Sequence, residues 1–473
     1  MLYEPNWRSL RQHAPAPQWL KDAKFGIYTH WGIYSVPACG PNGSWYGNRM
    51  YCSERPEHAF HLEHYGDPAK FGYKDFIPMF TAERFDPDQW AELFAKAGAR
   101  FAGPVAEHHD GFSMWNTSYS SWNAATMGPR RDVVAELEQA YRARGLKFLC
   151  ALHHFEHWGF FQHWTGEQAV PGDRLDPRYA EFYGRPTNGD NRADQAFLDR
   201  WLGKTKEVID RFSPDALWFD FGLRWVREDY KRAMIAHYFN HAVQNGQDPC
   251  LMWKGADSVV GSGVVDLELG RFSEMQHNEW ITDSTIDDSQ HPCEGGWGYV
   301  RGTKYKSADQ LIHYLIDNVS KNGYMLLNVG PKPDGTIPEE AERVLLEIGR
   351  WLAQNGEAIY ETTPWLRYGE GPTKIEGGGG FNEHANRALR YTARDFRFTV
   401  GKDNTLYATA LAWDDNEYEI TRPQALYPGE IKRITMLGTD EELSFKLDGH
   451  LHIAAPKQKP PVGIAYTLKI ERS

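Results

Sequence analysis

The sequence predicts an α/β protein: a (β/α)8-like TIM barrel in residues 1–365, followed by a C-terminal antiparallel β-sandwich in residues 366–473. Short apolar runs alternate with amphipathic stretches between about residues 20 and 360, as is typical of a barrel of parallel strands. After residue 365 the chain has the period of strands instead. A chain of 473 residues is also too long for one ordinary domain and fits a large domain with a smaller one.

Four apolar runs predict strands of the barrel, at residues 25–28, 101–105, 147–152 and 216–219. Each is short and almost continuously apolar, which suits a parallel strand that is covered on both faces. Amphipathic stretches at residues 86–98, 131–145 and 338–355 predict helices. In the second stretch Asp132 stands where an N-cap would, and Gly145 follows the last periodic residue as a C-cap.

The C-terminal part contains a glycine-rich stretch at residues 376–380, which predicts a turn or loop. Residues 397–400, 405–411 and 464–470 have the alternation of strands, and this predicts the antiparallel sandwich.

Composition and charge exclude several partners. The formal net charge is −12, and nucleic acids and anionic membranes attract clustered Lys and Arg, so we expect neither as a partner. No stretch approaches the roughly 18–20 apolar residues of a membrane span. The N-terminus lacks the basic and apolar segments of a signal peptide. The chain as written is therefore predicted to be cytoplasmic, or secreted or periplasmic if a signal was removed.

The cysteines predict neither a disulfide framework nor a structural metal, because five is an odd number and their spacings match no zinc pattern. They are Cys39, Cys52, Cys150, Cys250 and Cys293.

Histidines and one aspartate follow the four predicted strands: His30, His108 with His109, His153 with His154, and Asp220. Barrel enzymes carry their chemistry at these strand ends. A single histidine of this kind is more often structural, but a set favours function. Aromatic residues make up 14% of the chain, and imidazoles with indoles suit a sugar because they offer hydrogen bonds and an apolar face.

A metal site is the competing interpretation of this set, because histidine and aspartate are common ligands. Adjacent residues of an extended chain point to opposite faces, so each histidine pair is expected to give at most one inward ligand. A metal site assembled from several strand ends stays open on these grounds.

Asp220 is the first choice for the chemistry. It follows the apolar run 216–219, so its carboxylate is expected at the end of a buried strand, where flanking aromatic residues limit water. Nothing in the local sequence neutralises its charge. A retaining glycosidase needs a fixed, ionised carboxylate beside the anomeric carbon of the sugar, and Asp220 could supply it.

Five segments occur in an order that is specific as a set: KFGIYTHWG at 24–32, EHHDGF at 107–112, RDVV at 131–134, LWFDFG at 217–222 and NGYMLLNVGP at 322–331. The set resembles the α-L-fucosidases of glycoside hydrolase family 29. The resemblance implies a barrel with a C-terminal β-sandwich, no cofactor and no metal. It also implies a double displacement that releases L-fucose with retention from a fucosylated oligosaccharide or glycoconjugate. The resemblance is also compatible with a homo-oligomer.

The resemblance assigns roles by matching position. Asp220 would be the nucleophile, and the sugar contacts would come from His30, Trp45, His108, His109, His153, Trp218 and Trp297. Two positions depart from the family pattern: His153 falls where relatives often have Tyr, and Ser44 falls where many have Glu. These two differences could move the specificity to a related sugar.

The general acid/base does not stand at its usual place. Relatives often have it as a Glu directly after a Trp, but here Ile281 follows Trp280, and isoleucine cannot donate a proton. Glu268, Glu279 and Asp283 are nearby carboxylates that could substitute. Glu268 or Glu279 is the prediction, and the sequence does not choose between them.

Three functions are therefore compared. The first is an α-L-fucosidase, and the second is a glycosidase of the same scaffold that acts on an L-galactoside or a substituted fucoside. The third is a catalytically inactive sugar-binding relative, which Ile281 favours and the strand-end residues disfavour. Turnover of chromogenic glycosides would separate them.

Overall fold

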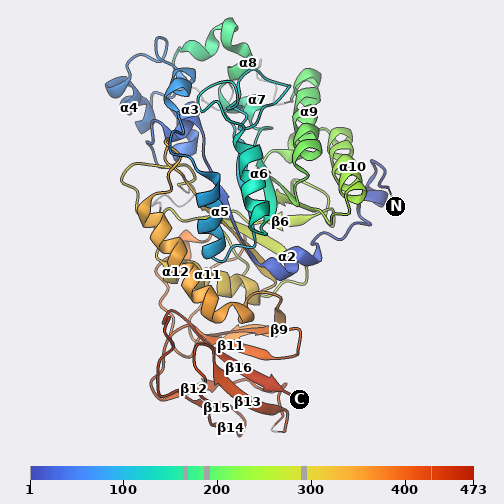
Figure 1. Ribbon diagram of the computed structural model, residues 1–473, viewed down its shortest axis with the longest axis vertical. Coiled ribbons are helices and arrows are strands. Elements are labelled where there is room, and N and C mark those ends of the chain that lie inside the picture. The colour runs from blue at the N-terminus through green and yellow to red at the C-terminus, as the bar shows by residue number, and fades with distance from the viewer. Residues whose placement is uncertain (1, 163–168, 186–191, 289–295, 428) are drawn as a thin grey trace.

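The computed structural model describes residues 2–162, 169–185, 192–288, 296–427 and 429–473, so Cys293 lies outside the described residues. A closed barrel of parallel strands forms the larger part, and two antiparallel sheets lie below it in Figure 1. The predicted barrel followed by a C-terminal β-sandwich is confirmed.

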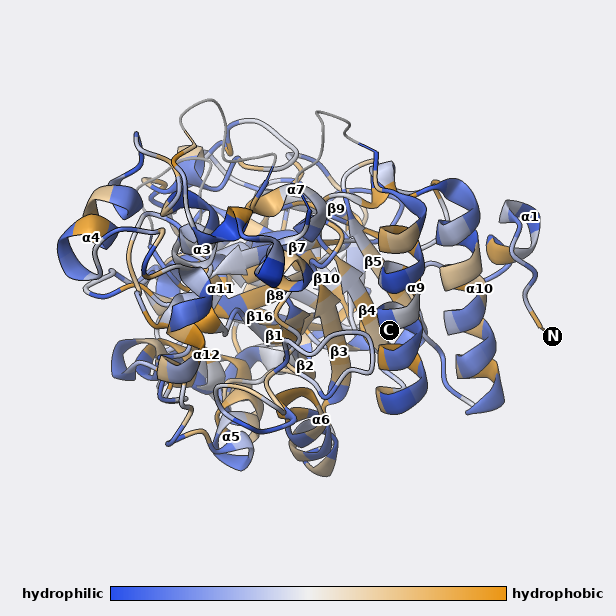
Figure 2. Ribbon diagram, turned by 90° about the horizontal axis from the view of Figure 1, so that it is seen from above, coloured by the Kyte–Doolittle hydropathy of each residue, from blue (hydrophilic) through white to orange (hydrophobic). Residues whose placement is uncertain are grey.

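The barrel strands stand in sequence order, and β8 pairs with β1 to close the ring. The strands are β1 Phe25–Thr29, β2 Phe101–Glu107, β3 Lys147–Leu152, β4 Ala216–Phe219, β5 Cys250–Lys254, β6 Val264–Asp266, β7 Trp280–Thr285 and β8 Gly323–Val329. The four predicted strands are β1 to β4. Almost every residue in them is buried, because side chains fill the barrel inside and helices cover it outside. Figure 2 shows the barrel strands from above, with helices such as α5 (Pro87–Lys96), α6 (Val133–Ala143) and α9 (Gln195–Phe212) around them.

Helices surround the barrel and extend its upper rim. They are α1 Trp7–Leu10, α2 Gln18–Ala23, α3 Tyr46–Arg49, α4 Pro56–His64, α5 Pro87–Lys96, α6 Val133–Ala143, α7 His157–Phe160, α8 Ala180–Tyr183, α9 Gln195–Phe212, α10 Glu228–Gln244, α11 Ala308–Ser320 and α12 Glu339–Asn355. The three predicted helices are α5, α6 and α12. Asp132 caps α6 as predicted, since its side chain accepts a hydrogen bond from the backbone N–H of Ala135.

Short 3₁₀ helices complete the connections: Ile33–Ser35, Gly43–Trp45, Tyr73–Met79, Asp173–Leu175, Pro177–Tyr179, Leu223–Trp225, Gly356–Ala358 and His384–Asn386. Residues 255–263 and 267–279, which follow β5 and β6, contain no helix. These two connections are therefore loops that can bend over the end of the barrel. Within the described ranges, no helix has both the length and the apolar character needed to cross a membrane.

The C-terminal part consists of a sheet ordered β13-β16-β11-β10-β9 and a sheet ordered β12-β15-β14. Their strands are β9 Thr363–Glu370, β10 Phe396–Val400, β11 Leu406–Ala410, β12 Glu417–Ile420, β13 Ile431–Met436, β14 Phe445–Leu447, β15 Leu451–Ala454 and β16 Tyr466–Arg472. Apolar side chains from both sheets, such as Phe398 and Ile453, form one separate core. The boundary expected between residues 365 and 366 falls inside β9, which pairs with β10 and so belongs to the second part.

A buried ion cluster joins the two parts. Asp317 of α11 accepts from Arg397 of β10 at 2.6 Å and from Lys321 at 2.9 Å, and Arg271 lies 3.5 Å from it. All four side chains are almost fully buried. Burial alone would raise the pKa of Asp317, but Lys321, Arg397 and Arg271 lower it below its usual range. The cluster therefore depends on one carboxylate that balances three cations.

Asp317→Asn is expected to lower the free energy of unfolding by about 3–5 kcal/mol, because it leaves buried cations without their counter-charge. Urea titration measures this, with Asp229→Asn as the control, since Asp229 forms an exposed pair with Arg227. A depressed folded-state pKa stabilises the fold above the unfolded pKa of about 4, and this stabilisation is lost as the pH falls further. An equal effect of both variants would contradict the role of the cluster.

Candidate active site

A cavity of about 360 Å³ lies at the carboxyl ends of the barrel strands. It contains every predicted site residue except Glu279: His30, Trp45, His108, His109, His153, Trp218, Asp220, Glu268 and Trp297. A larger cavity of about 910 Å³, between α11 and residues 383–391, is lined by none of them. The smaller cavity is therefore the candidate active site.

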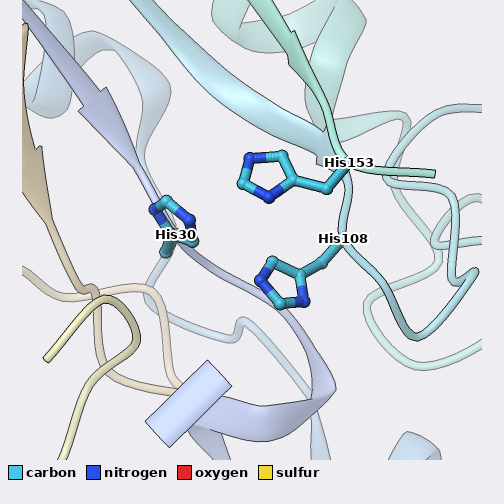
Figure 3. A group of neighbouring side chains, drawn as sticks. All are labelled: His30, His108 and His153. Carbon is cyan, nitrogen blue, oxygen red and sulfur yellow. The ribbon is translucent and has the colours of Figure 1, made fainter. Parts of the chain in front are cut away.

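The histidine rings in this cavity lie close together. The ring centroids of His30, His108 and His153 are 5.0–5.5 Å apart, and Figure 3 shows the three rings turned toward one another. His109 lies beside them, with its ring centroid 4.1 Å from that of His108. Three different strands thus bring four imidazoles to one place.

The pair His108 and His109 corrects the expectation that only one of two adjacent histidines points inward, since both line the cavity. The physical reason is that β2 ends at Glu107, so the alternation of an extended strand does not apply to these two residues. In the next pair only His153 faces the cavity. His154 is turned away, and its Nε2 lies 3.0 Å from Thr205 Oγ1.

Burial lowers the pKa of His30 and of His108 well below the usual value, and that of His109 to about 3. These rings are therefore neutral at pH 7, and each has one donor and one acceptor. His30 Nδ1 lies 2.8 Å from Asn328 Oδ1, an acceptor, so Nδ1 carries the proton. The lone pair of His30 is consequently on Nε2.

The Asp220 carboxylate lies directly after β4. Its Oδ2 is 3.1 Å from His153 Nδ1 and 3.5 Å from His109 Nε2. Burial alone would raise the pKa of Asp220, but His153, Lys254 and His109 lower it below the usual range. Asp220 is therefore ionised at neutral pH, and its charge is balanced by residues from neighbouring strands rather than by its own sequence neighbours.

A second carboxyl group, that of Glu268, follows β6. Lys254 Nζ, at the end of β5, lies 3.2 Å from Glu268 Oε2 and 3.3 Å from Asp266, and it also pairs with Asp283. Burial raises the pKa of Glu268 to about 8, with Lys254 opposing the shift and Asp283 and Asp220 adding to it. Glu268 is thus protonated at neutral pH, in the same cavity as the ionised Asp220.

Tryptophans supply the apolar walls. Trp218 packs 5.2 Å from the His153 ring, and its Nε1–H donates to Asp266 at 2.8 Å, which fixes the indole. Trp297 lies 5.4 Å from the ring of His30, and Trp45 lies 5.3 Å from that of His109. The cavity therefore combines polar ring nitrogens with flat apolar faces.

Comparison with known proteins identifies the family. A family model described as alpha-L-fucosidase matches residues 1–357, and one described as alpha-L-fucosidase C-terminal domain matches residues 382–471. The tissue alpha-L-fucosidase of Mus musculus is 32% identical over 99% of this chain and 95% of its own length. The chain belongs to the α-L-fucosidase family. It is accordingly a glycoside hydrolase.

Two further α-L-fucosidases are similar to this chain over nearly its whole length. The human tissue alpha-L-fucosidase is 30% identical over 99% of this chain and 91% of its own length. The crystal structure of Thermotoga maritima alpha-fucosidase in complex with fucose is 30% identical, with a TM-score of 0.76, and covers 99% of this chain and 100% of that one. Both parts of the fold are therefore shared with known α-L-fucosidases.

Glu279 does not belong to this cavity, which corrects one of the two predicted acid/base positions. It directly precedes β7, at the opposite end of the barrel from Asp220, and forms an ion pair with Lys21 at 2.8 Å. Ile281, at the position where α-L-fucosidases often have Glu, is fully buried in the interior of the barrel. Of the two preferred alternatives, only Glu268 thus shares the cavity with Asp220. Asp283, the third carboxylate, also lines it and pairs with Lys254.

Several residues line the cavity without having been assigned there from the sequence, among them Glu156, Phe221 and Phe381. Lys254 does not line the cavity itself but pairs with Glu268, which does; it ends the apolar run of β5, so the strand-end rule could have found it. Glu156 lies close to His153 in sequence, and its Oε2 is 3.1 Å from His109 Nδ1. Phe381 comes from the segment after the barrel, and its ring centroid lies 6.4 Å from that of Phe221. No local sequence pattern predicts this contact.

Proposed function

We propose that this glycoside hydrolase cleaves terminal α-L-fucosidic bonds with retention, through two displacements at the anomeric carbon. The observation that carries the proposal is the pair of carboxyl groups in one cavity, Asp220 ionised and Glu268 protonated at neutral pH. When the surroundings lower the pKa of one carboxyl group and raise that of the other, the ionised group can act as the nucleophile and the protonated group as the general acid. The resemblance to the Thermotoga maritima enzyme, which was solved with fucose, supports the choice of sugar.

In the first displacement a carboxylate oxygen of Asp220 attacks the anomeric carbon. Both histidine contacts of this carboxylate are made by Oδ2, so Oδ1 is the oxygen that we expect to attack. The glycosidic bond breaks, and its oxygen takes the proton of Glu268. The products of this step are the free aglycone and an ester between Asp220 and the sugar.

In the second displacement Glu268, now a carboxylate, takes a proton from water as the water oxygen attacks the anomeric carbon. The ester bond to Asp220 breaks, and L-fucose leaves with the α configuration. Glu268 is protonated again and Asp220 is again ionised. Lys254, 3.2 Å from Glu268, stabilises the carboxylate form that exists between the two steps.

The remaining side chains are proposed to recognise the sugar. Neutral His30 keeps the lone pair of Nε2 for a sugar hydroxyl, because its Nδ1 proton is donated to Asn328, and His108 Nδ1 has no partner among the described residues. His109 lines the cavity beside them. The indoles of Trp45, Trp218 and Trp297 offer apolar faces to the C–H groups of the ring.

A panel of nitrophenyl glycosides tests the proposal, with α-L-fucoside, α-L-galactoside and β-D-galactoside as substrates. We expect the highest kcat/KM for the α-L-fucoside, and proton NMR during early turnover should show α-L-fucose as the first product. A preference for the α-L-galactoside would support the second function, which Ser44 and His153 suggested. Binding of fucose without turnover of any glycoside would indicate the inactive relative instead.

We also propose that Glu156 positions His109. Burial, together with Asp220 and Glu268, raises the pKa of Glu156 well above its usual value, so it is protonated at neutral pH. Its Oε2 lies 3.1 Å from His109 Nδ1, and the backbone carbonyl oxygen of His153 lies 3.3 Å from the same nitrogen, so both contacts orient the ring with Nε2 toward Asp220. Glu156 would thus act on the Asp220 carboxylate through His109, whose Nε2 lies 3.5 Å from Asp220 Oδ2.

Glu156→Gln keeps a polar group of the same size beside His109 and is expected to retain most of kcat, whereas Glu156→Leu should lower kcat by about 10- to 100-fold. Both variants are compared with the wild type on nitrophenyl α-L-fucoside at pH 7, with thermal unfolding as the check on folding. Equal losses in the two variants would rule out the positioning role.

A further inference from the structure

Three imidazoles from three strands of the barrel converge in the cavity (Figure 3). His30 follows β1, His108 follows β2 and His153 follows β3. One ring nitrogen from each lies within 4.8 Å of the corresponding nitrogens of the other two. We propose that these histidines bind a divalent transition-metal ion of the zinc class, and that this ion and the sugar exclude each other from the cavity.

The geometry is close to that of a three-histidine metal site. Zn²⁺ binds imidazole nitrogens at about 2.0–2.1 Å, so two ligands of one tetrahedral ion lie about 3.4 Å apart. The limit of 4.8 Å exceeds this separation, so binding of an ion requires the rings to approach one another. Three protein ligands leave a fourth position for water, which is the usual arrangement when a zinc site is open to a cavity.

The ring nitrogens are also available. His30 donates its Nδ1 proton to Asn328 Oδ1 at 2.8 Å, which orients the ring and leaves Nε2 as the ligand, as in known histidine–metal sites. His108 Nδ1 and His153 Nε2 are buried and have no hydrogen-bond partner among the described residues. Buried polar atoms without partners are costly, so a bound cation or a sugar hydroxyl would stabilise this arrangement.

Charge in the cavity is compatible with a cation. Asp220 Oδ2 lies 3.1 Å from His153 Nδ1 and brings a full negative charge to the edge of the cluster. The cations nearby have acidic partners: Lys254 pairs with Asp266, Glu268 and Asp283, and Arg49, which lines the cavity, pairs with Glu57. A bound ion would occupy the space proposed for the sugar and attract the Asp220 carboxylate, so it should inhibit competitively.

Glu419, His450 and His452 form a separate group on the C-terminal part that could also hold an ion, and these residues are partly exposed. The experiment therefore uses a tag-free protein that carries His450→Asn and His452→Asn as its background. Co²⁺ is the probe, because tetrahedral Co²⁺ with nitrogen ligands absorbs visible light strongly. The background protein is expected to bind Co²⁺ with such a spectrum, and Zn²⁺ should displace it.

Two substitutions of neighbouring residues form the matched comparison. His153→Phe removes a ligand and should weaken Co²⁺ binding by more than about tenfold. His154→Gln changes the adjacent buried histidine, which faces Thr205 rather than the cavity, and should leave the binding unchanged. His108→Gln repeats the test at a second ligand if His153→Phe does not fold, and circular dichroism checks each variant.

L-Fucose should lower the apparent affinity for Co²⁺, and Zn²⁺ should raise KM for nitrophenyl α-L-fucoside without changing kcat. Absence of the tetrahedral spectrum, or equal losses in His153→Phe and His154→Gln, would overturn the proposal. This comparison with fucose rests on the proposed function: in a protein that turns over the α-L-fucoside, metal binding that fucose does not affect would place the ion elsewhere and overturn the proposal as well. The spectra of the variants require no turnover, so failure of the metal site and failure of the proposed reaction are separate results.

Discussion

Asp220→Gly is expected to lower kcat for nitrophenyl α-L-fucoside by on the order of 10⁴- to 10⁶-fold, because it removes the atom that forms the covalent intermediate. The expectation rests on the position of Asp220 after β4, inside the cavity, where His153 and His109 hold it and lower its pKa. Initial rates measured at pH 7 with equal amounts of folded protein give the comparison.

Azide separates the loss of a nucleophile from a loss of structure. The anion fits the space that the carboxylate leaves and can attack the anomeric carbon itself. Partial rescue of Asp220→Gly with β-L-fucosyl azide as the product would therefore identify Asp220 as the nucleophile of a retaining enzyme. If the variant keeps more than about a tenth of the wild-type rate without azide, another group performs the attack.

Glu268→Gln is expected to lower kcat by about 10²- to 10⁴-fold on substrates with a poor leaving group, such as a fucosyl disaccharide. The loss in the first step should be much smaller on the nitrophenyl glycoside, because nitrophenolate leaves without a proton. Glu279→Gln is the matched control. Glu279 pairs with Lys21 outside the cavity, so replacing its carboxylate with an amide should leave the turnover of both substrates unchanged.

The pH profile gives a second check on Glu268. Because its pKa is raised to about 8, it holds the proton below that pH, and wild-type turnover of the disaccharide should fall as the pH rises past about 8. Asp220 stays ionised throughout this range. The alkaline limb should be absent in Glu268→Gln, and azide should give this variant α-L-fucosyl azide, since two inversions then occur. Equal effects of Glu268→Gln and Glu279→Gln would refute the assignment.

Local patterns were sufficient for the outline of the fold. Buried parallel strands must be almost wholly apolar and amphipathic helices must repeat every three to four residues, so β1 to β4 and helices α5, α6 and α12 could be predicted from the order of residues. The strand-end rule also predicted the position of Asp220, because a polar residue after a buried apolar run has to lie at an end of the barrel.

The choice between Glu268 and Glu279 needed the tertiary structure. The two residues are close in sequence, but Glu268 follows β6 and Glu279 precedes β7, so they lie at opposite ends of the barrel. The run that forms β7, Trp280–Thr285, contains several polar residues and does not stand out as a buried strand. Without the limits of that strand, neither glutamate can be assigned to an end.

The sequence by itself thus determined the order of strands and helices, the family resemblance and the position of Asp220, because these depend on neighbouring residues and their periodicity. Only the tertiary structure decided the protonation states and the composition of the cavity. Glu156 and Phe381 reach it from separate segments, and the pKa values of Asp220 and Glu268 depend on burial and on charges carried by other strands, that of Lys254 in β5 among them. Both burial and Coulomb interaction act through space, so no local pattern could encode them.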